Sequence, residues 1–249
     1  MNLLGIDVGG SGIKGAIADT LSGEMVTKRK RIRTPDPATP DAMSDVIAEI
    51  VRHFDYKGPV GMGFPAAVVD GVVRTAANID ESWLNVNVEE LVARKSGCQT
   101  TVINDADAAG LAEMRFGAGR HSRGVVLVLT LGTGIDSGLF VDGKLVPNAE
   151  LGHVFLKGSR HDAEHHAANS AREREDLSWK KWAARLDEYL HHLEYLFWPN
   201  KFILGGGVSK RHNKFIPHLT VETEVTPAVL RNEAGIIGAA MAAVERERP

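Results

Sequence analysis

The chain has 249 residues, of which 43% are hydrophobic, a formal net charge of −3 and a single cysteine, Cys98. This length accommodates one large domain or two modest ones, and the hydrophobic content excludes disorder over most of the chain. The charge predicts no general attraction to nucleic acid or to an anionic membrane, and one cysteine excludes an internal disulfide. Because the N-terminus lacks a signal-peptide pattern and no apolar run is long enough to span a bilayer, we expect a cytoplasmic protein.

The chain begins with an apolar strand, a glycine turn and a second apolar strand, expected at residues 3–8 and 15–18. Glycines let backbone N–H groups surround an anion, because no Cβ blocks the approach. The turn also contains a literal G-x-G-x-x-G, but a dinucleotide site requires a helix after that motif, and here a strand follows. Two interpretations of the turn remain: it binds a phosphate together with a Mg²⁺ ion, or it is a plain hairpin turn. The candidate phosphate ligands are Asp7, Gly9, Gly10, Ser11, Gly12 and Lys14, with Asp7 also the candidate for an indirect contact to Mg²⁺.

The same pattern of strand, glycine turn and strand returns between residues 125 and 142. Two such turns can hold one phosphate chain from both sides. A third glycine run follows a short strand at 202–204. The candidate phosphate ligands in these two segments are Gly132, Thr133, Gly134, Gly205, Gly206 and Gly207.

A third strand is predicted over Glu24–Arg33, and it carries the basic run Lys28-Arg29-Lys30-Arg31-Ile32-Arg33. The run has two interpretations. It attracts a polyanion, or it is a solvated edge strand whose charges prevent aggregation.

Further elements follow from capping, turn and periodicity signals. Thr39 and Pro40 predict a helix start, Asp70-Gly71 a hairpin, and the aromatic and leucine spacing from Trp179 to Phe197 a long amphipathic helix that packs in the core or against another subunit. The remaining expected helices are 88–95, 108–116, an exposed polar one at 161–176, and 232–244; the remaining strands are 60–64, 100–103 and 144–146. This alternation predicts an α/β protein with two similar halves.

Two groups of residues are candidates for acceptor chemistry. Asp105 follows a strand and precedes a helix, which suits a general base in a cleft, although Asn104-Asp105 also fits an ordinary turn and helix cap. Glu150 and His153, three residues apart in a glycine-containing loop, can bind neighbouring hydroxyls of a sugar, or can be a surface pair. The segment His161–His166 offers zinc ligands, but it contains no cysteine and no second cluster supports it, so we expect no zinc.

Seven segments occur in a specific order: GIDVGGSGIKG from Gly5, GFPA from Gly63, RTAANI from Arg74, INDADAA from Ile103, LGTGI from Leu131, ELGH from Glu150 and LGGGVS from Leu204. In this order, over nearly the whole chain, the sequence resembles the ROK family of sugar kinases and, within it, the polyphosphate glucokinases.

The resemblance implies an actin-like, hexokinase-like (ribonuclease H-like) α/β fold with a cleft between a small and a large lobe. We expect the small lobe at 1–104, the large lobe at 105–232, and a C-terminal helix at 233–249 that packs back on the small lobe. The resemblance also implies glucose as acceptor, Asp105 as general base on the sugar 6-hydroxyl, polyphosphate or ATP as donor, and Mg²⁺ as cofactor. The glycine turns would hold the donor, with Gly205–Gly207 lining its nucleotide or outer phosphates. The implied glucose ligands are Asn78, Asn104, Asp105, Glu150, His153 and Glu164.

The chain departs from the family pattern in two places. It lacks the cysteine-rich zinc motif that most of the family carries after the Glu-x-Gly-His segment. In this absence it resembles the polyphosphate branch. Asp136 stands where the family usually has glycine, and a carboxylate beside a phosphate is repulsive. An ATP-dependent hexose kinase is one alternative, and a catalytically silent sugar-binding protein, suggested by Asp136, is the other. The apolar surface of the 178–198 helix predicts a homodimer.

Overall fold

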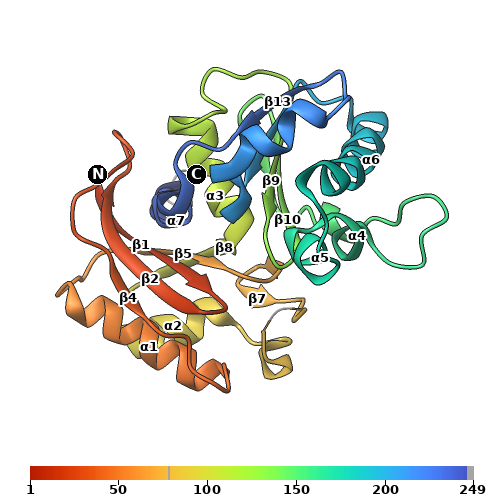
Figure 1. Ribbon diagram of the computed structural model, residues 1–249. Helices are drawn as coiled ribbons and strands as arrows, with labels where there is room; N and C mark the ends of the chain where they lie inside the picture. Colours follow the sequence, from red (N-terminus) through yellow and green to blue (C-terminus); the bar gives the residue numbers. More distant parts are fainter. Residues whose placement is uncertain (78, 246–249) are drawn as a thin grey trace. The chain divides into compact units, whose positions relative to one another are not determined.

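The computed structural model describes residues 1–77 and 79–245, and it divides into two compact units (Figure 1). Unit 1 comprises Met1–Ala112 and Glu233–Pro249, and unit 2 comprises Glu113–Asn232. The boundary falls inside helix α3, eight residues after the predicted division at 104/105. In the part of the chain that is described, no helix is both long enough and apolar enough to cross a bilayer.

Unit 1 is built on a sheet with the order β3-β2-β1-β5-β8, and β4 also pairs with β2. Strands β1, β5 and β8 are parallel, whereas β2 is antiparallel to β1, β3 and β4. The strands of this unit are β1 Asn2–Gly9, β2 Gly12–Asp19, β3 Glu24–Met25, β4 Lys30–Ile32, β5 Val60–Phe64, β6 Val68–Val69, β7 Val72–Val73 and β8 Thr100–Asn104.

The helices of unit 1 lie on both faces of this sheet (Figure 1). Alternate residues of β1 and β5 pack into a core with α1 and α2, while α7 packs on the opposite side. Gly5 and Gly61 permit this close approach, because a Cβ there would lie 1.9 and 1.7 Å from the carbonyl oxygens of Ile236 and Ala239. The helices are α1 Pro40–His53, α2 Val88–Ser96, α3 Asp105–Phe116, which continues into unit 2, and α7 Ala234–Glu245.

Unit 2 repeats the arrangement of a hairpin followed by parallel strands, in the order β11-β10-β9-β12-β13. Its core packs the sheet against α6, whose Trp182, Leu186, Tyr189, Leu190 and Leu193 are fully buried, as the amphipathic spacing predicts. The elements are β9 Val125–Leu131, β10 Ile135–Val141, β11 Lys144–Val146, α4 Ala163–Ala167, α5 Asn169–Arg174, α6 Trp179–Phe197, β12 Lys201–Gly205 and β13 Glu224–Pro227. Short 3₁₀ helices complete the two units at Glu81–Trp83, Leu151–His153, Gly207–Lys214, Ile216–His218 and Arg231–Glu233.

Several local predictions are confirmed. Thr39 caps α1 by accepting a hydrogen bond from the Ala42 amide, with Pro40 at the first helical position. Asp70 and Gly71 form the β6–β7 turn with positive φ angles of 52° and 75°. The strand expected at 144–146 has these bounds as β11.

Three predictions are wrong in detail. The strand over Glu24–Arg33 is interrupted, because the carbonyl of Ile17 accepts from the amides of both Val26 and Thr27, and this breaks the ladder between β3 and β4. Helix α3 begins at Asp105 rather than at 108, because the preceding asparagine caps it there.

The third concerns the polar segment 161–176, predicted as one exposed helix. It forms two short helices, α4 and α5, separated at Ala168, where the backbone is extended with ψ 159°. Four alanines, Ala163, Ala167, Ala168 and Ala171, are fully buried in the segment. These alanines form a buried face of the segment, which its polar composition does not indicate.

Candidate active site

The carboxyl ends of three parallel strands meet at one edge of the unit 1 sheet. Asp7 of β1 lies level with Gly63 of β5, which in turn pairs with Ile103 of β8. Asp105 follows two residues after Ile103, at the start of α3. Ligands of open α/β sheets bind beyond the carboxyl ends of their strands, so this edge is the expected position for a substrate.

The first glycine turn joins β1 to β2 at this edge. On β2, Lys14 lies directly across from Asp7, and its Nζ atom is 2.9 Å from Asp7 Oδ2. The chain beside the turn holds its backbone in place, because Thr34 Oγ1 donates to the Gly9 carbonyl at 2.6 Å and Arg31 Nη2 to the Ser11 carbonyl at 2.9 Å. The turn is therefore a hairpin between two strands, as predicted, and a dinucleotide site of the Rossmann type is excluded.

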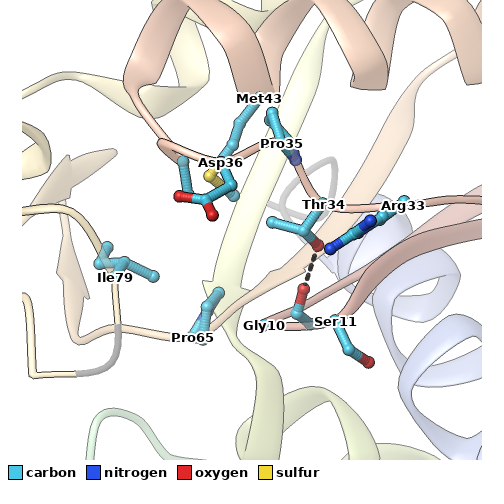
Figure 2. A pocket seen from close by; sticks show the side chains of 11 residues that line it. Gly10, Ser11, Arg33, Thr34, Pro35, Asp36, Met43, Pro65 and Ile79 are labelled. Atoms are coloured by element: carbon cyan, nitrogen blue, oxygen red, sulfur yellow. Dashed lines mark hydrogen bonds between the residues drawn. The ribbon is translucent and has the colours of Figure 1, made fainter.

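A pocket of about 380 Å³ opens beside this turn (Figure 2). One wall is the segment from Arg33 to Asp36, and Pro65 and Ile79 contribute to another. The lining residues are Gly9, Gly10, Ser11, Arg33, Thr34, Pro35, Asp36, Ala38, Met43, Pro65 and Ile79. Three candidate phosphate ligands thus line the pocket, whereas Asn104 and Asp105 do not. The predicted glucose ligand Asn78 lies outside the described residues.

Asn104 and Asp105 are fixed by the junction of β8 and α3. The Asn104 side chain is buried; its Oδ1 accepts from the amides of Ala106 and Asp107 at 2.8 and 3.2 Å, and its Nδ2 donates to the Ala66 carbonyl at 3.3 Å. The helix-cap interpretation is therefore confirmed for Asn104. Asp105 Oδ1 accepts from the Ala106 amide at 2.9 Å, so the carboxylate is oriented at a helix N-terminus.

Asp7 has the properties expected of an indirect Mg²⁺ ligand. Mg²⁺ keeps several waters and is commonly bound by one or two carboxylates together with substrate phosphates. The Asp7 side chain is 17% exposed, and Gly235 of α7 leaves room beside it, since a Cβ there would lie 3.1 Å from Asp7 Cγ. One oriented carboxylate beside a glycine turn fits this ion.

The second glycine turn lies in unit 2 and is held by α4 and α5. Glu164 Oε2 accepts from the Ile135 amide at 3.1 Å, and a Cβ on Gly134 would lie 2.4 Å from the same oxygen. An alanine at 134 would require the Glu164 carboxylate to shift away from this position. Ser170 donates from its amide to the Gly132 carbonyl at 3.1 Å and from its hydroxyl to the Thr133 carbonyl at 2.5 Å.

Beside this turn, acidic residues surround a histidine. His153 Nδ1 lies 2.9 Å from Asp162 Oδ2 and 4.0 Å from Glu164 Oε1, and His153 Nε2 lies 3.9 Å from Glu150 Oε2. The hydrogen bond to Asp162 is the largest cause of the raised pKa of His153. The structure thus brings Glu150, His153 and Glu164 together, and their carboxylates can accept hydrogen bonds from sugar hydroxyls.

Ligand atoms of three of these residues, His153, Asp162 and Glu164, lie within 4.8 Å of one another, a spacing at which they could hold a metal ion. Two of the three belong to the segment His161–His166.

The loop that carries Glu150 and His153 is fixed from both sides: Tyr189 of α6 donates to the Leu151 carbonyl at 3.1 Å, and the Leu151 amide donates to Ser137 Oγ at 2.9 Å.

Asp136 adds a half-buried carboxyl to the same cluster. It lies on β10 opposite Thr130. Burial is the main cause that raises its pKa to about 6, and the negative charges of Glu150 and Glu164 raise it further, while His153 lowers it. Burial also raises the pKa of Glu150. The charged neighbours of Asp136 in unit 2 are thus the predicted sugar ligands.

The third glycine run lies against the second turn. Gly205 of β12 pairs with Thr130 of β9, and a Cβ on Gly206 would lie 2.5 Å from the Leu131 carbonyl oxygen. Gly206 also has a φ of 80°, which favours glycine. Unit 2 therefore brings Gly132–Gly134, Gly205–Gly207, Glu150, His153 and Glu164 into one region, and unit 1 brings the first turn and the Asn104-Asp105 junction to one sheet edge.

Three residues to which the sequence analysis assigned no supporting role at the site have one in the structure: Thr34, Asp162 and Ser170. Asp162 had a usable signal, because an aspartate three residues before His165 fits an N-cap, and its Oδ1 does accept from the His165 amide. Thr34 and Ser170 bind turn backbone from distant segments, for which the local sequence carries no signal.

Known proteins resemble this chain over nearly its full length. The family model named ROK family matches residues 3–169. The polyphosphate glucokinase of Mycobacterium tuberculosis (strain CDC 1551 / Oshkosh) is 49% identical over 241 residues, which cover 96% of this chain and 90% of that protein.

Solved structures agree. The inorganic polyphosphate/ATP-glucomannokinase from Arthrobacter sp. strain KM has a TM-score of 0.93 at 49% identity, covering 99% of both chains. A ROK family glucokinase from Streptomyces griseus, in complex with glucose and AMPPNP, has a TM-score of 0.82 at 25% identity, covering 98% of this chain and 100% of that one. The expected two-lobed, hexokinase-like α/β fold is confirmed by this likeness. Together with the ordered motifs and the two glycine hairpins, these matches show that the chain belongs to the ROK family.

Proposed function

We propose that this protein transfers a phosphoryl group from inorganic polyphosphate to the 6-hydroxyl of glucose. The observation that carries the proposal is the 49% identity, over nearly the full length, to two proteins. One is named polyphosphate glucokinase and the other inorganic polyphosphate/ATP-glucomannokinase. The two glycine hairpins, the Asp105 carboxylate and the group Glu150, His153 and Glu164 support the proposal, because such a reaction requires groups that bind the donor phosphates, a carboxylate for the acceptor hydroxyl and groups that bind the sugar.

Asp105 is the proposed general base. Its carboxylate takes the proton of the sugar 6-hydroxyl as that oxygen attacks the terminal phosphorus in line. A new bond forms between sugar oxygen and phosphorus, and the bond from that phosphorus to the bridging oxygen breaks. The shortened polyphosphate leaves with the electron pair. The cap that Asn104 places on α3, and the hydrogen bond from the Ala106 amide, orient Asp105 for this role.

Glucose would be bound by Asn78, Asn104, Asp105, Glu150, His153 and Glu164. The carboxylates of Glu150 and Glu164 accept from sugar hydroxyls, and His153 is oriented by Asp162. Asn78, Asn104 and Asp105 belong to unit 1, and Glu150, His153 and Glu164 belong to unit 2.

The donor would be held by the glycine turns, with Gly9, Gly10, Ser11, Gly12 and Lys14 from unit 1. The unit 2 ligands would be Gly132, Thr133, Gly134, Gly205, Gly206 and Gly207. Mg²⁺, bound through water to Asp7, would supply positive charge to the donor phosphates. Lys14, 2.9 Å from Asp7, would place a second cation on the donor.

ATP is a second candidate donor. The name of the Arthrobacter enzyme includes both donors, and the Streptomyces griseus structure holds the ATP analogue AMPPNP. A catalytically silent sugar-binding role is the other alternative, motivated by Asp136.

A donor panel tests these alternatives. Purified protein, glucose and Mg²⁺ are combined with polyphosphate, ATP or neither, and glucose 6-phosphate is measured. Faster formation from polyphosphate supports the proposal. Equal or faster formation from ATP favours the ATP-dependent kinase, and glucose binding without transfer from any donor supports the silent role.

We also propose a cytoplasmic homodimer. The C-terminal end of α6 presents Tyr195, Leu196 and Trp198, which are 75%, 50% and 77% exposed, and burial in a second subunit would remove this apolar surface from water. Sedimentation equilibrium would reveal the dimer; a monomer at micromolar concentration contradicts it.

A further inference from the structure

The basic segment Lys28–Arg33 is the most concentrated charge on unit 1. Five of its six residues are lysine or arginine, in a chain whose net charge is −3. Lys28, Arg29, Arg31 and Arg33 are exposed, and Lys30 is half-buried. Among the residues that the structure describes, none of the five forms an ion pair with a carboxylate. Their mutual repulsion is uncompensated within that part of the chain.

This segment lies beside the first glycine turn, because β4 pairs with β2, the strand that leaves the turn. Arg31 of β4 lies across from Lys14 of β2, which lies across from Asp7 of β1, and residues paired in this way project from the same face of a sheet. Gly12 makes room for Arg31, because a Cβ there would lie 2.6 Å from Arg31 Nε. The Arg31 guanidinium also donates to the Ser11 carbonyl.

The other end of the segment reaches the pocket. Arg33 lines it together with Gly9, Gly10 and Ser11 (Figure 2). A phosphate at the glycine turn would therefore have Arg31 and Arg33 as neighbouring cations, with Lys28 and Arg29 farther along the chain.

We propose that Lys28–Arg33 binds the distal phosphates of a long inorganic polyphosphate whose terminal phosphates are held at the first glycine turn. This inference rests on the proposed function. Alternate residues of extended backbone are about 6.6 Å apart, so Arg31 of β4 and Arg29 and Arg33, which flank β4, would extend over about 13 Å. A flexible polyanion matches this row of cations, which form no ion pair within residues 1–77 and 79–245.

The interpretation of the segment as a protected edge strand explains why some charge is present on β4. It does not explain the hydrogen bond between Arg31 and the turn or the position of Arg33 at the pocket. The two interpretations also differ in consequence, because only the donor-binding role depends on donor length.

The test uses the full-length double variant Lys28→Gln/Arg29→Gln, which leaves Arg31 and Arg33 in place. Its matched control is Arg52→Gln/Arg94→Gln, which removes two exposed cations from α1 and α2 of the same unit. For each protein, KM and kcat are measured with polyphosphate of several hundred units, with tripolyphosphate and with ATP.

We expect the KM for long polyphosphate to rise about tenfold or more, since two unit charges 4 Å apart in water change affinity by about fivefold per pair. The KM values for tripolyphosphate and ATP should change less than twofold, because these donors are too short to reach Lys28. The control should match the unmodified protein with every donor. Added salt should raise the KM for long polyphosphate less steeply in the Lys28/Arg29 variant.

An unchanged KM for long polyphosphate, or an equal rise for all three donors, overturns the inference. If the unmodified protein transfers phosphate from no polyphosphate at all, the proposed function fails instead. Direct binding of long polyphosphate, measured by fluorescence anisotropy, then still compares the variant with its control. Weaker binding by the Lys28/Arg29 variant alone would retain the segment as a polyanion site, and equal binding would refute it.

Discussion

Replacing Asp136 by asparagine should stabilise the protein at neutral pH. Asparagine has nearly the shape of aspartate but cannot ionise. The pKa of Asp136 rises from 3.8 to about 6 on folding. Between these values the folded protein holds a proton that the unfolded chain has released, so stability falls as the pH rises through this window. Above pH 6 the full cost of the ionised carboxylate is present.

The shift of about two units, at 1.36 kcal/mol each, gives a cost of about 3 kcal/mol at pH 7.5. The variant should therefore gain up to about 3 kcal/mol at pH 7.5 and almost nothing near pH 4. For a chain of this size, about 2–4 °C per kcal/mol corresponds to a rise of about 6–12 °C in Tm.

Thermal unfolding followed by circular dichroism at pH 4, 5.5 and 7.5 measures this difference. Asp70→Asn is the matched control, because Asp70 is an exposed residue of the β6–β7 turn. Its Tm difference should stay nearly constant with pH. A Tm for Asp136→Asn at pH 7.5 equal to or below that of the unmodified protein would refute the reasoning, as would a difference that does not grow from pH 4 to 7.5.

Three further substitutions test the proposed roles. Asp105→Asn should lower kcat at least 100-fold with little change in the KM for glucose, because it removes the base and keeps the shape, as steady-state kinetics will measure. Gly134→Ala should raise the KM for glucose and lower Tm, because the added Cβ would lie 2.4 Å from Glu164 Oε2. Asp162→Asn should lower the pKa of His153, measured by NMR titration, and should destabilise the protein more at pH 5.5 than at pH 8.5, because the favourable contact requires the charged imidazole.

The controls separate these effects from general damage. Gly132→Ala serves as the stability control for Gly134→Ala, since a Cβ on Gly132 meets no atom within 4 Å. An equal loss of Tm in both variants would contradict the steric argument. Most of the turnover remaining in Asp105→Asn would eliminate it as the base, and an unchanged His153 titration in Asp162→Asn would contradict the assigned hydrogen bond.

The sequence predicts elements whose signals are local. The two glycine hairpins, the Thr39 cap of α1 and the apolar face of α6 follow from residues within a few positions of one another. The break between β3 and β4 depends on pairing with Ile17 of another strand, and the start of α3 depends on which atoms the Asn104 side chain bonds. Neither the break between β3 and β4 nor the start of α3 can be predicted from neighbouring residues alone.

The site divides in the same way. The ELGH motif predicts Glu150 and His153 and the family resemblance implies Glu164, but Asp136 joins their cluster only because the sheet and α4 fold around it. Its raised pKa is a property of that tertiary arrangement. The roles of Asp105 and of the glucose and phosphate ligands remain predictions for the experiments above.

The seating of α7 on the unit 1 sheet has a consequence for synthesis on the ribosome. Unit 2 is a continuous segment, whereas the sheet of unit 1 is covered by a helix that is translated after unit 2. Until Ala234–Glu245 has emerged, the strand face around Gly5 and Gly61 lacks the backbone that lies against it in the folded protein. Domains generally fold as units during synthesis. The N-terminal strands of unit 1 therefore cannot complete their packing until α7 has been synthesised, whereas unit 2 can form its core earlier.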